Sequence, residues 1–174
     1  VVVSHLDRDH IRGLLPFLKW FLETHNGTVG HVYVGLDRDR ERVSKTAAEL
    51  IDAVLGWESD RRFALHAPQR EDVPRVIHRG GSWEASLILP RYSALLRTEM
   101  DGEDEPNRCS VALRVTCGSR AVIIGGDVPL VSWESLEPGL IEACAVRAPH
   151  HGGGIRESSP TWSEGSFYEA TKAD

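Results

Sequence analysis

Side chains that bind metal ions are concentrated at the start of the chain. Residues 1–3 are three valines, which predict a buried strand because β-branched residues favour strands. Two histidines and two aspartates follow within six positions: His5, Asp7, Asp9 and His10. Imidazole nitrogens and carboxylate oxygens are common ligands of divalent metals. The order favours a turn in which His5 and Asp7 serve one ion and Asp9 and His10 serve a second, although a polar loop would have a similar composition.

Two further apolar segments run into residues of the same kind. Residues 121–124 predict a strand that ends in Gly125-Gly126-Asp127, and residues 144–146 predict a strand that leads into Pro149-His150-His151-Gly152. Strands of a layered α/β fold that expose their polar ends at one edge bring such residues together. We therefore expect Asp127 and one of the two histidines to join the first cluster, in a single constellation.

The order of these motifs resembles a known family. Residues 4–14, Ser-His-Leu-Asp-Arg-Asp-His-Ile-Arg-Gly-Leu, resemble the metallo-β-lactamase superfamily signature His-x-His-x-Asp-His followed by Gly-Leu. Asp7 stands in place of the second histidine of this signature. In this respect the chain resembles the branch that contains the nuclease domain of the competence protein ComEC. Asn107-Arg108-Cys109-Ser110, Gly126-Asp127 and residues 149–152 resemble the later motifs of that branch. The resemblance implies an α/β fold, a metallo-β-lactamase-like αββα sandwich.

The resemblance also assigns roles to individual residues. It implies a metal-binding set made of His5, Asp7, Asp9, His10, Asp127 and His151. Asp127 would bridge two ions, and Asp9 would also take part in catalysis. His151 is favoured as the ligand of the histidine pair, which leaves His150 to face the substrate phosphate or the leaving group, but the opposite assignment stays open. Asn107 occupies the region where many members of the superfamily place another histidine ligand, which this chain lacks.

The function that these features predict is metal-dependent hydrolysis. Two divalent ions, zinc or manganese, lower the pKa of a shared water and hold the attacked group. The expected substrate is a phosphodiester, possibly in DNA. One alternative is a non-catalytic binding or regulatory domain that retains the fold, and another is a hydrolase of a different ester, a lactone or a lactam. The sequence contains no Gly-x-Ser-x-Gly motif and no P-loop, so it gives no support to a serine nucleophile or a nucleotide-binding loop.

Size and composition set limits on these readings. The 174 residues predict one domain, 1–174, with a core of its own. The net charge of −6 argues against extensive contact with nucleic acid, but not against cutting a phosphodiester. No apolar run is as long as a membrane span. The three cysteines lie in apolar, strand-like contexts, which predicts buried free thiols in a reducing compartment, the cytoplasm.

The remaining pattern predicts the elements that position these residues. Helices are expected over residues 14–22, 43–55, 92–100 and 132–141, the last with Ser132 as its N-cap and an interruption at Pro138-Gly139. Further strands are expected over 31–35, 63–65, 76–77, 86–89 and 111–117. Residues 157–174 are polar and show no strong periodicity. Family members generally carry strands before the first motif and after the last. We therefore expect the chain to be part of a longer protein, truncated at both ends, with an unpaired edge on its first sheet.

Overall fold

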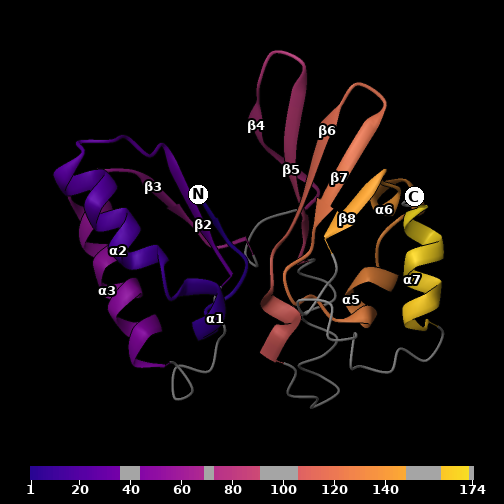
Figure 1. Cartoon of the computed structure of the whole chain (residues 1–174), viewed down its shortest axis with the longest axis horizontal. Helices are drawn as coiled ribbons and strands as arrows, with labels where there is room; N and C mark the ends of the chain where they lie inside the picture. The colour runs from indigo at the N-terminus through magenta and orange to yellow at the C-terminus, as the bar shows by residue number, and fades with distance from the viewer. Residues whose placement is uncertain (36–43, 69–72, 91–105, 148–161, 173–174) are drawn as a thin grey trace. The chain divides into compact units, whose positions relative to one another are not determined.

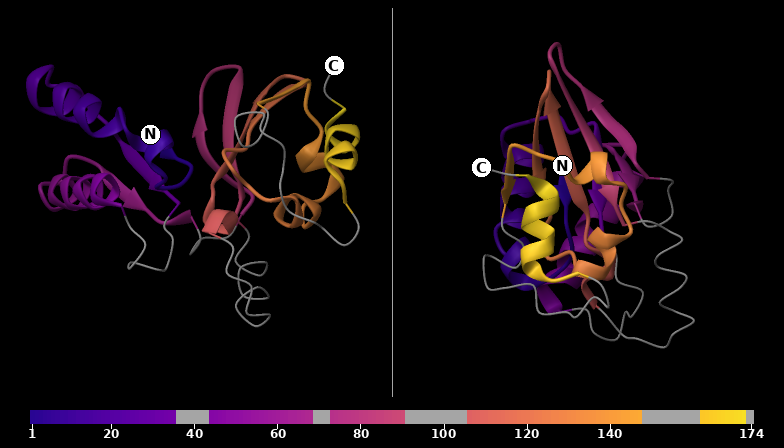
Figure 2. Two further views of the ribbon diagram at one scale, coloured as in Figure 1. Left: turned by 60° about the horizontal axis from the view of Figure 1, so that its bottom comes forward. Right: turned by 90° about the vertical axis from the view of Figure 1, so that its right-hand side faces the viewer.

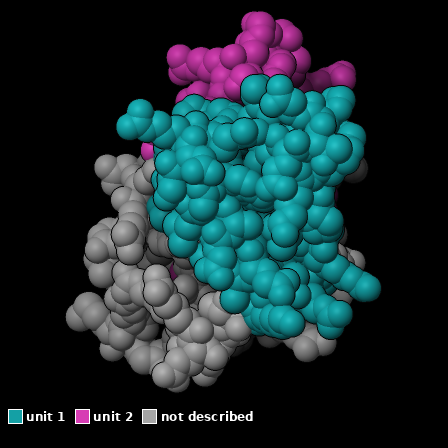
Figure 3. All heavy atoms as spheres, turned by 90° about the vertical axis from the view of Figure 1, so that its left-hand side faces the viewer, with its two compact units in different colours: residues 1–67 teal, residues 68–174 magenta. Residues whose placement is uncertain are grey.

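The computed structural model describes residues 1–35, 44–68, 73–90, 106–147 and 162–172, and these residues form a mixed α/β structure with two sheets and several helices (Figures 1 and 2). The chain divides into two compact units, residues 1–67 and residues 68–174, which are coloured separately in Figure 3.

The first unit contains a parallel sheet. Its described strands are β1 (Val2–Val3), β2 (His31–Val34) and β3 (Ala64–His66), in the order β1-β2-β3. Its helices are α1 (Arg8–Ile11), α2 (Leu14–Lys19), the π-helix η1 (Trp20–Thr24) and α3 (Lys45–Ser59). Parallel strands require crossover connections, and these helices lie in them. Within the described residues β1 pairs only with β2, so the predicted unpaired edge is present.

One face of this sheet is covered by α2 and α3. Leu18 from α2, Leu50 and Val54 from α3, and Val32 and Val34 from β2 belong to one buried cluster. The side chain of Ser44 caps α3 by accepting a hydrogen bond of 3.2 Å from the Ala47 N–H. The predicted helix over 43–55 is therefore confirmed in its main part, and it continues to Ser59.

The second unit contains a five-stranded sheet in the order β4-β5-β6-β7-β8. The strands are β4 (Arg75–Arg79), β5 (Trp83–Leu89), β6 (Ala112–Cys117), β7 (Arg120–Ile124) and β8 (Ala145–Arg147). The helices are the 3-10 helix η4 (Pro106–Cys109), α5 (Leu130–Glu134), α6 (Pro138–Ile141) and α7 (Glu164–Thr171). Neighbouring strands are antiparallel except for β7 and β8, which are parallel. The predicted hairpin at Gly118-Ser119 is confirmed.

Helices α5, α6 and α7 lie on one side of this sheet (Figures 1 and 2). Trp133, Ile141 and Phe167, one from each helix, are fully or almost fully buried against Ile123 of β7. Side chains alternate along a strand, so Val122 and Ile124 point to the opposite face, where both are exposed. The sheet therefore has one face that α5, α6 and α7 cover and one that carries exposed apolar side chains.

One prediction about a helix in this unit is wrong. Ser132 is not an N-cap: Pro129 is the N-cap of α5, and Ser132 is buried inside the helix. The C-terminal region, which shows no strong periodicity in the sequence, contains α7, which begins with a capping box between Ser163 and Ser166. The helix predicted over 92–100 lies outside the described residues.

The prediction of buried cysteines is also wrong. Cys117 and Cys144 are exposed, and Cys109 is half-buried. Cys117 is the last residue of β6, beside the hairpin turn, and Cys144 lies in the loop before β8 instead of in the strand. Neither position carries its side chain into the core.

Of the described helices, none combines the length and the apolar character that crossing a membrane requires.

Candidate metal centre

The first cluster of candidate ligands lies where β1 gives way to α1. Asp7 is the N-cap of α1, and its carbonyl accepts hydrogen bonds from the N–H groups of His10 at 3.0 Å and Ile11 at 3.2 Å. Ile11 is completely buried and fixes this short helix against the core of the first unit. Asp9 and His10 therefore belong to α1, and not to a turn as expected. The turn of helix brings His10 back beside His5.

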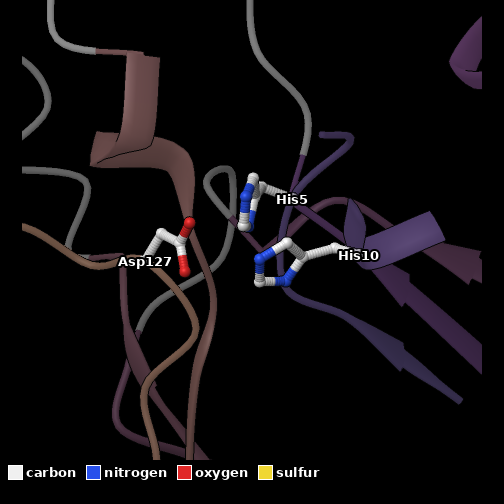
Figure 4. A group of neighbouring side chains, drawn as sticks. All are labelled: His5, His10 and Asp127. Carbon is white, nitrogen blue, oxygen red and sulfur yellow. The ribbon is translucent and has the colours of Figure 1, made fainter. Parts of the chain in front are cut away.

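The rings of His5 and His10 are close together and share one hydrogen-bond partner. Their centroids are 4.0 Å apart, and Figure 4 shows the two side chains next to each other. The Ser4 hydroxyl oxygen lies 3.1 Å from Nδ1 of His5 and 3.3 Å from Nδ1 of His10. A hydroxyl oxygen has two lone pairs, so it can accept from both Nδ1–H groups. In that tautomer each Nε2 atom carries the lone pair that a metal needs.

Each of the two Nε2 atoms has a carboxylate near it. Nε2 of His5 lies 3.7 Å from Oδ2 of Asp7, and Nε2 of His10 lies 3.9 Å from Oδ2 of Asp9. Both distances are too long for a hydrogen bond. Both are within the span of two bonds of about 2.0–2.2 Å to a common ion, which is at most roughly 4.4 Å, and a tetrahedral ion would draw the two atoms a few tenths of an ångström closer. The histidine–aspartate pairs are those that the sequence predicted.

Exposure differs between the two kinds of ligand. The His5 and His10 side chains are 6% and 8% exposed, whereas the Asp7 and Asp9 side chains are 68% and 62% exposed. The imidazoles are thus held by the protein, and the carboxylates face solvent. An ion bound by such pairs would be fixed on one side and reachable by a substrate on the other.

Asp127 occupies a tight turn in the second unit, just after β7 (Figure 4). Gly126 has a φ of +55°, a conformation that favours glycine, and the Val128 N–H donates to the Gly125 carbonyl at 3.2 Å. Gly125 lies so close to Trp133 that an added Cβ would be 2.5 Å from the indole ring. The turn therefore requires both glycines, and it places Asp127 in a buried position with 7% exposure.

The other predicted site residues are only partly accounted for. His150, His151 and Gly152 lie outside the described residues. Strand β8, which precedes them, is parallel to β7, with Arg147 opposite Ile124, so the chain leaves both strands at the same edge of the sheet. Asn107 lies in η4, and its carbonyl accepts a hydrogen bond from the Ser110 N–H at 2.9 Å.

Sequence reasoning missed the role of Ser4. The signal was present, because a hydroxyl residue stands directly before the first histidine of the motif.

Comparison of the chain with protein-family models gave no match, and comparison with curated proteins gave none either.

Proposed function

We propose that this protein is a metal-dependent hydrolase that cleaves phosphodiester bonds. The observation that carries the proposal is the arrangement around Ser4. One hydroxyl orients the His5 and His10 rings so that the second nitrogen of each has an aspartate oxygen within 4 Å. In an ordinary polar loop the same histidine–aspartate geometry is not expected to occur twice.

The residues present fit a metal centre. Histidines that bind metals usually donate their other ring N–H to an oxygen, which fixes the ring orientation and the tautomer. Ser4 is placed to do this for both rings at once. The donor set also contains hard carboxylate oxygens beside imidazole nitrogens, so manganese suits it as well as zinc does.

The proposed centre has two parts. His5 with Asp7 and His10 with Asp9 form the first part, and the proposal assigns Asp127 and His151 to the second. A carboxylate such as Asp127 suits a bridging position because its two oxygens bind two cations and offset their mutual repulsion. When bound, the ions supply a nucleophile derived from water and electrostatic stabilisation of the attacked phosphate.

The protein's own residues would then bind and orient the substrate. The exposed carboxylates of Asp7 and Asp9 leave one side of the centre open to a phosphodiester. We assign Asp9 a second task, accepting a proton near the attacking oxygen, and His150 the role of facing the substrate phosphate or the leaving group. The proposal needs no serine or cysteine nucleophile.

The proposed fold is a metallo-β-lactamase-like αββα sandwich over residues 1–174, related to the ComEC nuclease branch. Two observations support it. Helices α2 and α3 pack on one face of the first sheet, and α5, α6 and α7 pack on one face of the second.

The first experiment measures bound metal and hydrolysis together. Elemental analysis of the purified chain should find about two zinc or manganese ions per chain, and the protein should hydrolyse bis(p-nitrophenyl) phosphate. His10→Ala should lose metal and lose hydrolysis by at least ~100-fold. His25→Ala is the matched control, because His25 is an exposed histidine of the same unit that stacks on Trp20. A wild-type chain without metal, or equal losses in both variants, would refute the proposal.

The second experiment separates DNA from small substrates. A nuclease binds DNA more weakly as salt rises, because counterions are released from the phosphates that the protein neutralises. With a net charge of −6, the slope should be shallow and the affinity modest. Cleavage of the small phosphodiester without cleavage of DNA assigns a small substrate. A metal-loaded chain that cleaves neither is not a phosphodiesterase, which leaves the binding module and the hydrolase of another ester, a lactone or a lactam.

A further inference from the structure

A second pair of histidines lies on the sheet of the first unit. His31 is the first residue of β2, and His66 is the last residue of β3. Nδ1 of His31 and Nε2 of His66 are 3.0 Å apart. His31 is exposed and His66 is half-buried, so solvent and small ions reach the pair.

This pair is separate from the ligands around Ser4. Strands β1 and β2 are parallel, with Val3 opposite Val34, so His31 lies three residues before the point at which β1 ends. Three residues of strand span about 10 Å. His66 lies opposite Tyr33, which lies opposite Val2, so β2 stands between His66 and β1 and separates them by two strand spacings, about 10 Å. An ion held by His31 and His66 would therefore not be shared with His5 or His10.

We propose that His31 and His66 form a binding site for a copper(II) or nickel(II) ion. Two bonds of about 2.0–2.1 Å that meet at a right angle place their nitrogen atoms roughly 2.8–3.0 Å apart, whereas a tetrahedral angle requires about 3.3–3.4 Å. The observed 3.0 Å matches the right angle, which is the geometry that copper(II) and nickel(II) adopt with nitrogen ligands. Water completes the coordination on the exposed side.

The protein holds the pair ready for an ion. Tyr33 is directly opposite His66 in the register of the sheet, and its ring stacks on the His66 ring with centroids 4.5 Å apart and planes 14° apart. Tyr33 is buried, so it limits the rotation of His66. Both histidines are also fixed through their strand backbones. A ligand that is already in place loses little conformational entropy when the ion binds.

Binding requires a change of tautomer but no net loss of a proton. In the metal-free pair one imidazole donates its N–H and the other accepts it. The ion needs the lone pair of both facing nitrogens. The donor ring therefore moves its proton, through solvent, to its other nitrogen, and both rings stay neutral.

The test is a copper(II) titration of the full chain, with nickel(II) in a parallel series. Equilibrium dialysis gives the number of ions bound per chain, and electron paramagnetic resonance reports nitrogen ligands of copper. His31→Gln and His66→Gln should each bind one ion fewer than the wild type and lose the signal of two equivalent nitrogens. The zinc or manganese content of each variant should not change, which separates this site from the ligands around Ser4.

The matched control is His78→Gln. His78 is an exposed histidine on β4 that stacks on Trp83, and it should leave the copper stoichiometry unchanged. Circular dichroism checks that each variant is folded. If the His31 and His66 variants bind as much copper and nickel as the wild type, the pair is only hydrogen-bonded and the proposal is wrong. An equal loss in His78→Gln also overturns it.

Discussion

Ser4→Ala tests the central geometric argument, because it removes a hydroxyl group that contacts both imidazoles. The variant loses two hydrogen bonds, of 3.1 Å to His5 and 3.3 Å to His10. A net hydrogen bond contributes about 0.5–1.5 kcal/mol, so two of them set an upper range of about 1–3 kcal/mol. Since about 1.4 kcal/mol is tenfold in affinity, and outer-shell partners of metal ligands are usually worth 10–100-fold, we expect metal binding to weaken by about 10–100-fold.

The assay is competition for zinc or manganese against a chelating dye, with thermal denaturation of the metal-free protein alongside it. Ser4→Thr keeps the hydroxyl and should keep the affinity. Ser44→Ala is the matched control, since it is the same chemical change in the same unit and removes the cap of α3. It should lower the free energy of unfolding by about 1 kcal/mol and leave metal affinity unchanged.

Two results would refute the reasoning. In the first, Ser4→Ala binds metal within about twofold of the wild type, which is less than the contribution of one hydrogen bond. In the second, Ser44→Ala loses as much affinity as Ser4→Ala, which would show that general stability sets the affinity and not the orientation of the rings.

Three further predictions concern the second unit. Asp127→Asn keeps the shape and removes the charge, so bound metal should fall and hydrolysis should drop by at least ~100-fold, while thermal denaturation shows a preserved fold; unchanged metal occupancy would end the bridging role. Gly125→Ala places a Cβ 2.5 Å from the ring of Trp133 and should destabilise the protein by about 1–3 kcal/mol in urea unfolding. Gly139→Ala meets open space in α6 and should be neutral or slightly stabilising, so equal effects at the two glycines would contradict the packing argument. Ser163→Ala removes the capping box of α7 and should lower the free energy of unfolding in urea by about 1 kcal/mol, with no change in metal content. An unaltered urea midpoint would show that the cap does not stabilise the protein.

The sequence predicted the strand ends well because the relevant signals are local. Alternation and β-branched residues identified β6 and β7, and the glycines after Ile124 identified the turn that carries Asp127. The pairing of His5 with Asp7 followed from spacing alone. What spacing could not give is the position of Ser4 between the two rings, because that depends on the turn of helix that brings His10 back.

The elements that the sequence did not predict have weak local signals. Helix α7 is short, and the two serines of its capping box, Ser163 and Ser166, are as common in loops as in caps; its buried side chain is Phe167. Ser132 looked like a cap because serine favours that position. Pro129, three residues before it in an extended conformation, starts the helix earlier, and Trp133 then packs into the core. Tertiary packing decided both outcomes.

The position of β1 at the edge of its sheet links metal binding to local unfolding. Only Val2 and Val3 form the strand, and hydrogen bonds such as those from the Tyr33 and Gly35 N–H groups, of 2.9 and 3.1 Å, tie it to β2. Such a segment opens at a small fraction of the free energy of global unfolding. A ligand that binds only the closed form stabilises it by about 2.7 kcal/mol at a hundred times its dissociation constant. An ion held by His5, two residues beyond β1, would therefore close this edge, and the amide of Gly35 would exchange its hydrogen roughly a hundredfold more slowly.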